Sequence, residues 1–477
     1  MRQLTALDAN FLNAEGGGTL THIAGLAVLD PTTRPGNRLT CADLARLVAE
    51  RASLAAPLRQ RLVSVPLGLD RPYWADDPDF DPAWHISEVG LPAPGDDAQL
   101  AETVALLHER ELDRSRPLWE AVIIQGLLGG RVAVYAKVHH AATDGVLAAD
   151  ILAALLDLSP EPRPVPEAGA EPVPAPSPAA MVSAGLTRSV FHPVAAARSL
   201  AQAAPYLDEV PLLGQLPGAR RVARALQEAL GRDPLPPGPR LVAPPTPFNG
   251  PVGRRRSVAF GSLPLAEVKR ARGALGGSVN DVVMALCAAA LRRWLDKRGR
   301  LPDVPLVAAV PASLRRRSAA ADGANQVSVM LAQLPTHLDD PAERFTAMRQ
   351  GMAAAKRRFA VTGGGWLDAL SQLAPVPLSG PLVRLAMRTG SVRPINLMVS
   401  NVPGPQFPLY LCGARVLAYH PVSVVSDLTG GINITVFSYD GRLDIGIVAC
   451  RDMVPDPGEL IDHLDDALDE LKGLLEP

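Results

Sequence analysis

The sequence contains few cysteines and few aromatic residues. Of its 477 residues, 4 are Cys and 4% are Phe, Trp or Tyr. The cysteines lie far apart in the chain, at Cys41, Cys287, Cys412 and Cys450. Such sparse use is typical of a protein in a reducing compartment. The spacing also excludes a disulfide framework and a zinc site built from Cys-x-x-Cys pairs.

The sequence also lacks a charge excess and a long apolar run. Lys and Arg number 47 against 49 Asp and Glu, which argues against a nucleic-acid binder driven by overall charge. No apolar run reaches the roughly 18 residues of a membrane span, and the first residues lack the apolar segment of a secretory signal. We therefore expect a cytoplasmic protein. The mean hydropathy of +0.11 leaves room for a peripheral contact with lipid.

Hydrophobic residues, proline and glycine are abundant. Hydrophobic residues make up 47% of the chain, enough for sizeable cores, and the length suggests at least two domains. Proline-rich breaks at 159–178 and 234–251 divide the sequence. We predict an N-terminal domain over 1–158, a proline-rich crossover linker and helical middle segment over 159–250, and a C-terminal domain over 251–477.

Both outer domains mix strand-like and helix-like segments, so we predict an α/β or α+β fold with sizeable sheets. Segments 131–140 and 432–439 alternate apolar and polar residues as strands do. Segment 278–297 is apolar over a length typical of a buried helix. The middle residues 181–231 are mostly helical in pattern, either as a bundle packed over the two domains or as an amphipathic region that faces lipid.

The most informative stretch is KVHHAATDG, at residues 137–145. Strand alternation places His140 on the apolar, inward face of its strand, with His139 on the opposite face. Asp144 falls at the entry of the next helix, where the helix dipole favours a carboxylate. An imidazole held at a strand end in this way can act as a general base near neutral pH.

Other interpretations of the two histidines stay open from the pattern alone, because paired histidines can be core or surface residues without chemistry. Metal binding is disfavoured, since adjacent strand side chains diverge and no third ligand stands at a metal-binding spacing. A serine hydrolase is disfavoured because the sequence has no Gly-x-Ser-x-Gly motif. A base without a nucleophile favours direct transfer, in which His140 activates the acceptor itself.

The stretch HHAATDG resembles the HHxxxDG motif of the bacterial wax ester synthase/diacylglycerol acyltransferase family, within the superfamily of CoA-dependent acyltransferases. Other segments resemble that family in the same order: LTALDANFLNAEGGGTLTHIAGLAVLD near the N-terminus, RPLWE at 116–120, SVND at 278–281, PASLR at 311–315 and NLMVSNVPGP at 396–405. HHxxxD alone is moderately specific, whereas the ordered set is highly specific. The resemblance covers almost the whole chain except the linker and the middle segment.

The resemblance implies two domains, each a mixed sheet flanked by helices, with an active-site tunnel at their interface. Acyl-CoA would enter from one side and an alcohol or diacylglycerol from the other, with no cofactor. The implied activity is O-acyl transfer that makes triacylglycerol or wax esters, at the inner face of a membrane or on lipid droplets if the protein is peripheral. Alternatives are a condensation-like acyltransferase that depends on a carrier protein, and an inactive lipid-binding protein of the same fold.

The resemblance also implies roles for the residues of the HHxxxDG motif. His140 would be the catalytic base, and His139 would support or pack beside it. Asp144 would be structural, turned away from the substrate and paired with an arginine, for which Arg315 is the candidate. Gly145 completes the motif.

Two further segments carry candidate site residues. Asn280 would hold the thioester carbonyl or orient the end of its helix, whereas capping of that helix is enough to explain Asp281. Asn401, Pro403 and Gly404 belong to a rigid loop that would line the tunnel, or that is a plain turn.

The RPLWE segment is expected to be structural. Pro117, Leu118 and Trp119 would pack at the start of a strand, and Glu120 would be a buried hydrogen-bonding residue. The basic runs at 254–256 and 315–317 could contact the phosphates of CoA, although such runs are usually solvated.

Overall fold

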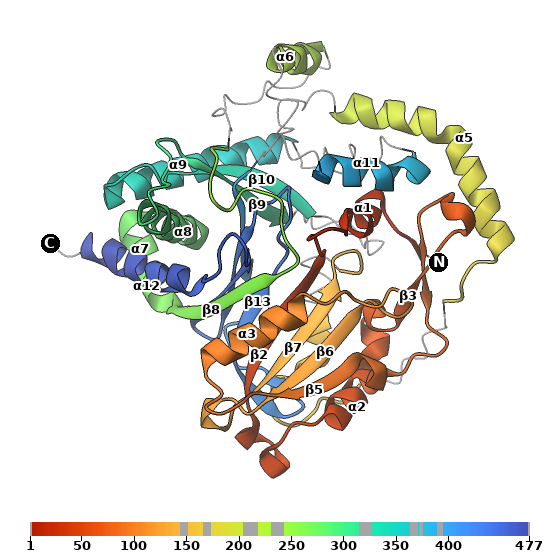
Figure 1. Ribbon diagram of the computed structural model, residues 1–477, viewed down its shortest axis with the longest axis horizontal. Coiled ribbons are helices and arrows are strands. Elements are labelled where there is room, and N and C mark those ends of the chain that lie inside the picture. Colours follow the sequence, from red (N-terminus) through yellow and green to blue (C-terminus); the bar gives the residue numbers. More distant parts are fainter. Residues whose placement is uncertain are drawn as a thin grey trace.

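A computed structural model of the chain describes residues 2–143, 151–165, 173–203, 218–229, 243–313, 327–362, 371, 375–388 and 395–475. Within these ranges the strands form two six-stranded sheets and a three-stranded one (Figure 1). The first sheet has the order β12 (Tyr410–Leu411), β13 (Ala414–Val422), β2 (His22–Asp30), β7 (Val132–His139), β6 (Trp119–Gln125) and β5 (Ile86–Gly90). The small sheet has the order β1 (Arg2–Gln3), β4 (Tyr73–Asp76) and β3 (Gln60–Val63).

The second large sheet mixes parallel and antiparallel pairs. Its order is β10 (Val327–Leu334), β9 (Leu306–Ser313), β11 (Leu397–Pro403), β14 (Ile432–Tyr439), β15 (Arg442–Cys450) and β8 (Arg256–Pro264). The strand β11 runs parallel to both of its neighbours, and the other pairs are antiparallel. Asp440 and Gly441 form the tight turn between β14 and β15, both with positive φ as such a turn requires.

Helices flank both large sheets. They are α1 (Ala6–Ala14), α2 (Cys41–Arg51), α3 (Asp97–His108), residues 151–155, α5 (Pro178–Ala203), α6 (Ala219–Ala229), α7 (Leu265–Leu275), α8 (Val279–Asp296), α9 (Pro341–Thr362), α11 (Val376–Arg388) and α12 (Gly458–Gly473). Short 3-10 turns lie at Pro31–Thr33, Pro35–Asn37, Ala52–Leu54, Ala56–Leu58, Pro66–Gly68, Pro82–His85 and Leu128–Gly130. In the first sheet, α2 packs on one face and α3 on the other.

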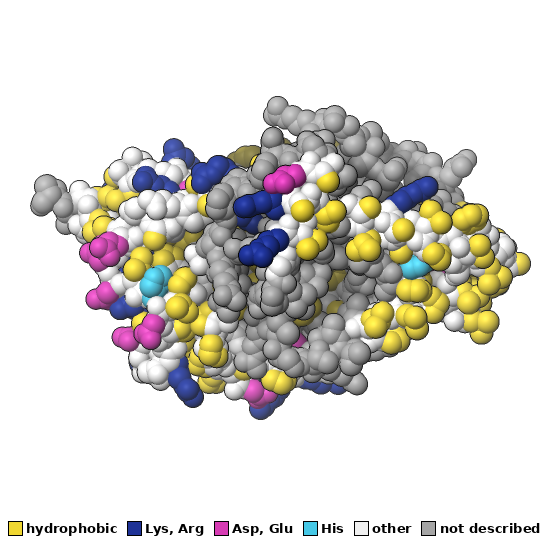
Figure 2. All heavy atoms as spheres, turned by 90° about the horizontal axis from the view of Figure 1, so that it is seen from above, with side chains coloured by type: hydrophobic (Ala, Val, Ile, Leu, Met, Phe, Trp, Pro, Cys, Tyr) yellow, Lys and Arg dark blue, Asp and Glu magenta, His cyan; other side chains and the backbone are white. Residues whose placement is uncertain are grey.

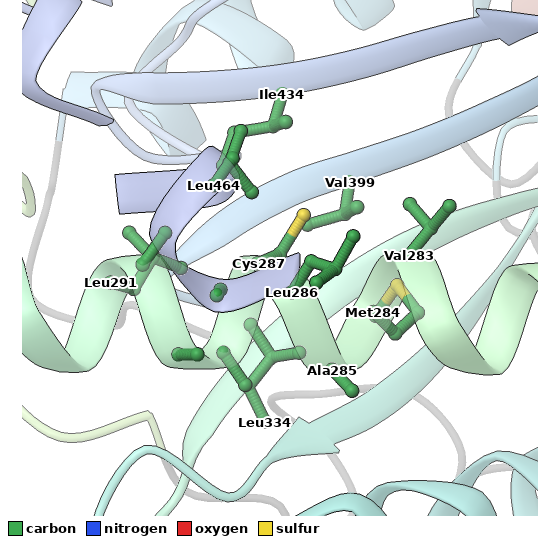
Figure 3. Close-up of a cluster of buried hydrophobic side chains, with 14 of the residues drawn as sticks. Val283, Met284, Ala285, Leu286, Cys287, Leu291, Leu334, Val399, Ile434 and Leu464 are labelled. Atoms are coloured by element: carbon green, nitrogen blue, oxygen red, sulfur yellow. The ribbon is translucent and has the colours of Figure 1, made fainter. Parts of the chain in front are cut away.

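The core of the second sheet is built around α8. This helix is buried on all sides from Asp281 to Leu291, as expected for a helix that is apolar all round. Figure 3 shows Leu286 and Cys287 of α8 near Val399 of β11, and Leu464 of α12 near Ile434 of β14. Among the described helices, no single one has the length and hydropathy of a membrane span, although the bent pair α7 and α8 passes by length and composition.

The two large sheets share a strand segment and a core. Residues 410–422, from the C-terminal half of the chain, supply β12 and β13 to the first sheet. β13 also packs against β15 of the second sheet. A common apolar cluster joins Leu26 of β2, Leu100 of α3, Val422 of β13 and Val448 of β15. The halves of the molecule are therefore held together by a continuous core.

The predicted fold class is confirmed, and many element bounds agree with the sequence pattern. Segment 432–439 is β14, and the predicted helix over 278–297 is α8 with Ser278 as its N-cap. The predicted strand over 131–140 ends one residue early, so His140 lies in a turn beyond β7. The domain boundaries stay a prediction, and the insertion of 410–422 into the first sheet is a feature that the sequence did not suggest.

The crossing of β13 and β15 depends on Gly446. A Cβ atom at Gly446 would lie 1.7 Å from the carbonyl oxygen of Pro421. We expect Gly446→Ala to lower the free energy of unfolding by about 2 kcal/mol through overpacking, measured by urea denaturation. Gly473→Ala is the control, because nothing lies within 4 Å of its Cβ position. Equal stabilities of the two variants would contradict this view of the sheet contact.

Candidate active site at the end of strand β7

The two histidines lie where β7 ends. His139 is the last residue of the strand and is buried, with 1% of its surface exposed. His140 follows in a turn and is half-buried. Its backbone N–H donates to the carbonyl oxygen of Thr21, at 2.8 Å. Its ring stacks on Phe11 of α1, with the centroids 4.1 Å apart and the planes at 14°. The imidazole of His140 is thus held flat against an aromatic ring.

Both ring nitrogens of His139 are engaged by the protein. The backbone N–H of Ala141 donates to Nδ1 at 3.0 Å, so Nδ1 is unprotonated and the proton is on Nε2. Nε2 lies 3.2 Å from Oε1 of Glu15 and 3.2 Å from Oγ1 of Thr21. His139 therefore has no nitrogen left for a substrate, and its supporting role in the site stays a prediction.

Glu15 anchors this arrangement from the end of α1. It accepts from the backbone N–H of Thr21 at 2.9 Å and from Arg114 at 2.6 Å, besides its contact with His139. Burial alone would raise the pKa of Glu15. The hydrogen bonds from His139, Arg114 and Thr21 outweigh burial and lower that pKa far below its ordinary value. The carboxylate is therefore charged at neutral pH.

A buried ion pair lies on the same face of β7 as the side chain of His139. Nζ of Lys137 lies 2.7 Å from Oε1 of Glu120, its register partner on β6. Nζ also donates to the carbonyl oxygens of Leu107 at 3.0 Å and Arg110 at 2.8 Å, where α3 ends. Burial lowers the pKa of Lys137, and Glu120 opposes that shift. Glu120 is thus a structural ion-pair partner, as its segment predicted.

The rest of the RPLWE segment is packed as expected. Pro117, Leu118 and Trp119 are all buried. The indole N–H of Trp119 donates to the carbonyl oxygen of Leu58 at 2.8 Å, and its ring stacks on His85 with a centroid distance of 4.4 Å. These contacts fix the start of β6 beside β7.

Asn280 and Asn401, predicted from separate segments, come together. Nδ2 of Asn401 on β11 donates to Oδ1 of Asn280, at the first turn of α8, over 3.3 Å. Both side chains are partly exposed. Asp281 caps the helix instead, since its Oδ2 accepts from the backbone N–H of Ser278 at 2.8 Å, and its Oδ1 pairs with Lys356 at 3.3 Å. Asn280 is therefore not needed for capping.

The loop after Asn401 is tightly built. Pro403 ends β11 and is exposed. The backbone N–H of Gly404 donates to Oγ of Ser438 at 3.1 Å, and a Cβ at Gly404 would lie 2.4 Å from the ring of Phe437. Phe437 in turn contacts Tyr419 of β13, with centroids 4.9 Å apart. The contact between Phe437 and Tyr419 therefore connects this loop of the second sheet to the first sheet.

Three predicted residues lie outside the described part of the chain: Asp144, Gly145 and Arg315. The proposed pairing of Asp144 with Arg315 therefore stays a prediction. The basic run 254–256 lies within the described residues, and each of its arginines has protein partners. Arg256 is buried against carbonyl oxygens of Gly253 and Gly18, while Arg254 and Arg255 pair with acidic side chains.

The sequence did not identify Phe11, Glu15, Thr21 and Lys137 as site residues. The first three belong to the N-terminal segment that resembles the family, but strand periodicity gives no reason for them to meet the end of β7. Lys137 could have been identified from the sequence as a residue of interest, because a lysine within an apolar central strand needs a partner for its charge. Among the described residues, no group of three or more His, Cys, Asp or Glu could hold a metal ion.

Comparisons with known protein families identify the family of the chain. The model of the wax ester synthase/diacylglycerol acyltransferase catalytic domain matches residues 4–283, and the model of the family's C-terminal domain matches 323–472. A protein of Mycobacterium tuberculosis named as a diacylglycerol O-acyltransferase is 37% identical, over 99% of this chain and 90% of its own length. Another from that species, with a similar name, is 35% identical over 98% of this chain and 97% of its own.

Solved structures give the same result. The wax ester synthase/diacylglycerol acyltransferase from Marinobacter aquaeolei VT8 has a TM-score of 0.70 and 28% identity, with 99% of each chain covered. The first condensation domain of the calcium-dependent antibiotic synthetase has a TM-score of 0.53 and 16% identity, covering 98% of this chain and 96% of that one. The condensation domain is similar in fold alone.

The Glu15 contacts predict an acid-sensitive contribution to stability. At pH 7, Glu15→Gln should lower the free energy of unfolding by about 2 kcal/mol, because charge-assisted hydrogen bonds are lost. The pKa of Glu15 is lowered from its ordinary 4.5 on folding. Its stabilisation is therefore complete above about pH 4.5 and is lost as the pH falls toward the folded-state pKa.

Urea denaturation of the wild type and the variant from pH 7 to pH 3 measures this difference, which should shrink on acidification. Glu111→Gln is the control, because Glu111 is in an exposed pair with Arg254 that should contribute little. A Glu15 effect as small as that of Glu111, or one that does not depend on pH, would contradict the assignment.

Proposed function

The chain belongs to the wax ester synthase/diacylglycerol acyltransferase family, and we propose that His140 is the general base of its acyl transfer. As an O-acyltransferase, it uses acyl-CoA as donor and an alcohol or diacylglycerol as acceptor, giving wax esters or triacylglycerol. The observation that carries the proposal is the placement of His140 directly after β7, with its ring stacked on Phe11 of α1. The neighbouring His139 is held by Glu15, Thr21 and the backbone of Ala141.

The transfer proceeds in a single displacement without an acyl-enzyme. His140 accepts the proton of the acceptor hydroxyl as its oxygen attacks the thioester carbonyl carbon. The tetrahedral oxyanion collapses with cleavage of the carbon–sulfur bond, and the imidazolium gives its proton to the departing CoA thiolate. The products are the ester and free CoA. General base catalysis of this kind contributes roughly 10²–10⁴-fold to the rate.

Asn280 is the candidate donor to the oxyanion. Its Oδ1 accepts from Asn401, so its Nδ2 group faces away from that bond. Among the described residues, Nδ2 of Asn280 makes no other hydrogen bond, which leaves its hydrogens available to a substrate oxygen. A preorganised donor of this kind is worth about 3 kcal/mol in the transition state. The Asn401 contact acts as a positioning bond that links β11 to the start of α8.

Replacing the base should abolish most turnover without unfolding the protein. We expect His140→Ala to lower kcat roughly 10²–10⁴-fold in an assay of free CoA release from acyl-CoA plus hexadecanol or diacylglycerol. His463→Ala on α12 is the control, because that histidine lies on a helix of the second sheet. Thermal unfolding of both variants checks the fold. Near-normal turnover by folded His140→Ala would refute the assignment.

The same assay separates the alternative functions. Ester made only from a carrier-bound acyl group would indicate a condensation-like enzyme. Binding of lipid without ester from any donor would indicate an inactive lipid-binding protein.

We further propose that α5 and α11 present a lipid-facing surface, as a peripheral protein with such substrates requires. Figure 2 shows hydrophobic side chains gathered at the right of the view, where α5 lies. Leu186, Val190 and Val194 recur every fourth residue along α5 and are exposed, and Phe191 beside them is 63% exposed. Leu378 and Leu382 of α11 are also exposed. An amphipathic helix with such a face binds in the membrane interface.

Introducing charge on this surface provides the test. The double variant Val190→Asp, Phe191→Asp should lose most flotation with vesicles of phosphatidylglycerol and phosphatidylcholine, because two exposed apolar side chains of the proposed lipid-facing surface become charged. Leu106→Asp on α3 is the matched control, since Leu106 is an exposed leucine elsewhere. Flotation of the double variant equal to that of wild type would contradict the proposed surface.

A further inference from the structure

An apolar cavity lies on the face of the first sheet that α2 covers. Its volume is about 140 Å³, and it is partly open to solvent. The sheet forms its floor, α2 contributes Leu44 and Val48, and the segment after the HHxxxDG motif contributes Ile151, Leu152 and Leu155. The cavity is thus bounded on three sides by described elements of the N-terminal domain.

A row of small residues creates the space. Ala136 of β7 is in register with Gly25 of β2 on one side and with Ala121 of β6 on the other. These three residues share one face of three adjacent strands, and all of them line the cavity. Ala136 is exposed although its strand lies between β2 and β6. Side chains in the middle of a sheet are normally covered by other residues. The uncovered space over Ala136 is therefore a gap in the packing that the fold itself creates.

The lining is suited to an alkyl chain. Glu120 and Lys137 border the cavity, but their side chains pair with each other on the opposite face, toward α3. Tyr419 lies across Gly25, where a Cβ would be 1.9 Å from its hydroxyl oxygen. Burial raises the pKa of Tyr419 to about 12, so the phenol is neutral. No charged side chain of a described residue therefore offers a partner to a polar ligand there.

One lining residue of the cavity is close to His140 in the sequence. Val138 of β7 lines the cavity and lies two residues before His140. Val138 packs against the cluster that surrounds the cavity and also against the cluster that contains Phe11. Phe11 is the ring on which His140 stacks. From Val138, the cavity extends along β7 to Val134, roughly 13 Å at the usual rise of a strand.

We propose that this cavity holds the alkyl chain of the acyl donor, with the thioester at the His140 end and the terminal methyl toward Val134. The proposal rests on the proposed acyl transfer and names where its donor chain lies. Diacylglycerol has two chains, whereas the acyl-CoA donor brings one to either reaction. Each methylene taken out of water adds to donor binding, so the depth of the cavity sets the preferred chain length.

Filling the gap in the row of small residues tests this assignment. In Ala136→Leu, the added side chain occupies the space two residues from Val138. We expect kcat/KM for hexadecanoyl-CoA to fall roughly tenfold or more, since at least two methylenes lose their burial. The value for hexanoyl-CoA should change less than twofold. Leu152→Ala enlarges the cavity and should shift the preference toward longer donors.

Ala98→Leu is the matched control, because it adds the same atoms at an exposed position of α3, and its donor preference should equal that of wild type. Isothermal titration of hexadecanoyl-CoA without acceptor separates the cavity from the chemistry. Donor affinity roughly tenfold weaker in Ala136→Leu supports the cavity even if no ester forms. Unchanged donor affinity and donor preference in folded Ala136→Leu and Leu152→Ala would overturn the proposal. A shift in acceptor chain length alone would overturn it too.

Discussion

The site depends on the hydrogen bonds that hold His139 at the end of β7. Glu15, Thr21 and the backbone of Ala141 together occupy its imidazole. His140 follows directly in a turn, so fixing His139 against Glu15 also fixes the start of that turn. Phe11 then orients the second ring by stacking. In the proposed mechanism, these contacts give two identical side chains different roles, one structural and one as the base.

The fold delivers the remaining groups through the contact between its two sheets. Strand β13 comes from the C-terminal half of the chain but joins the first sheet, and it crosses β15 where Gly446 permits close approach. The Asn280–Asn401 pair belongs to the second sheet, and the adjoining loop reaches the first through Phe437 and Tyr419. In the proposed mechanism, the Asn280–Asn401 pair of the second sheet acts together with His140, which follows β7 of the first sheet.

Much of this architecture could be predicted from the sequence. Alternation placed β14, capping chemistry placed the start of α8, and the ordered motifs indicated the family. Contacts between distant segments could not be predicted, because periodicity describes one element at a time. The insertion of β13, the meeting of Glu15 with His139, and the register of Gly25, Ala136 and Ala121 all depend on tertiary pairing. Asp144 and Arg315 lie outside the described residues.

Chemical modification of the histidines tests the central claim most directly. Diethyl pyrocarbonate acylates accessible imidazole nitrogens, and fragmentation mass spectrometry distinguishes adjacent residues. The account predicts that loss of activity follows modification of His140, that a bound acyl-CoA slows it, and that His139 stays unmodified while the protein is folded. Inactivation that follows modification of His139, with His140 unmodified, would contradict the division of roles between the two histidines.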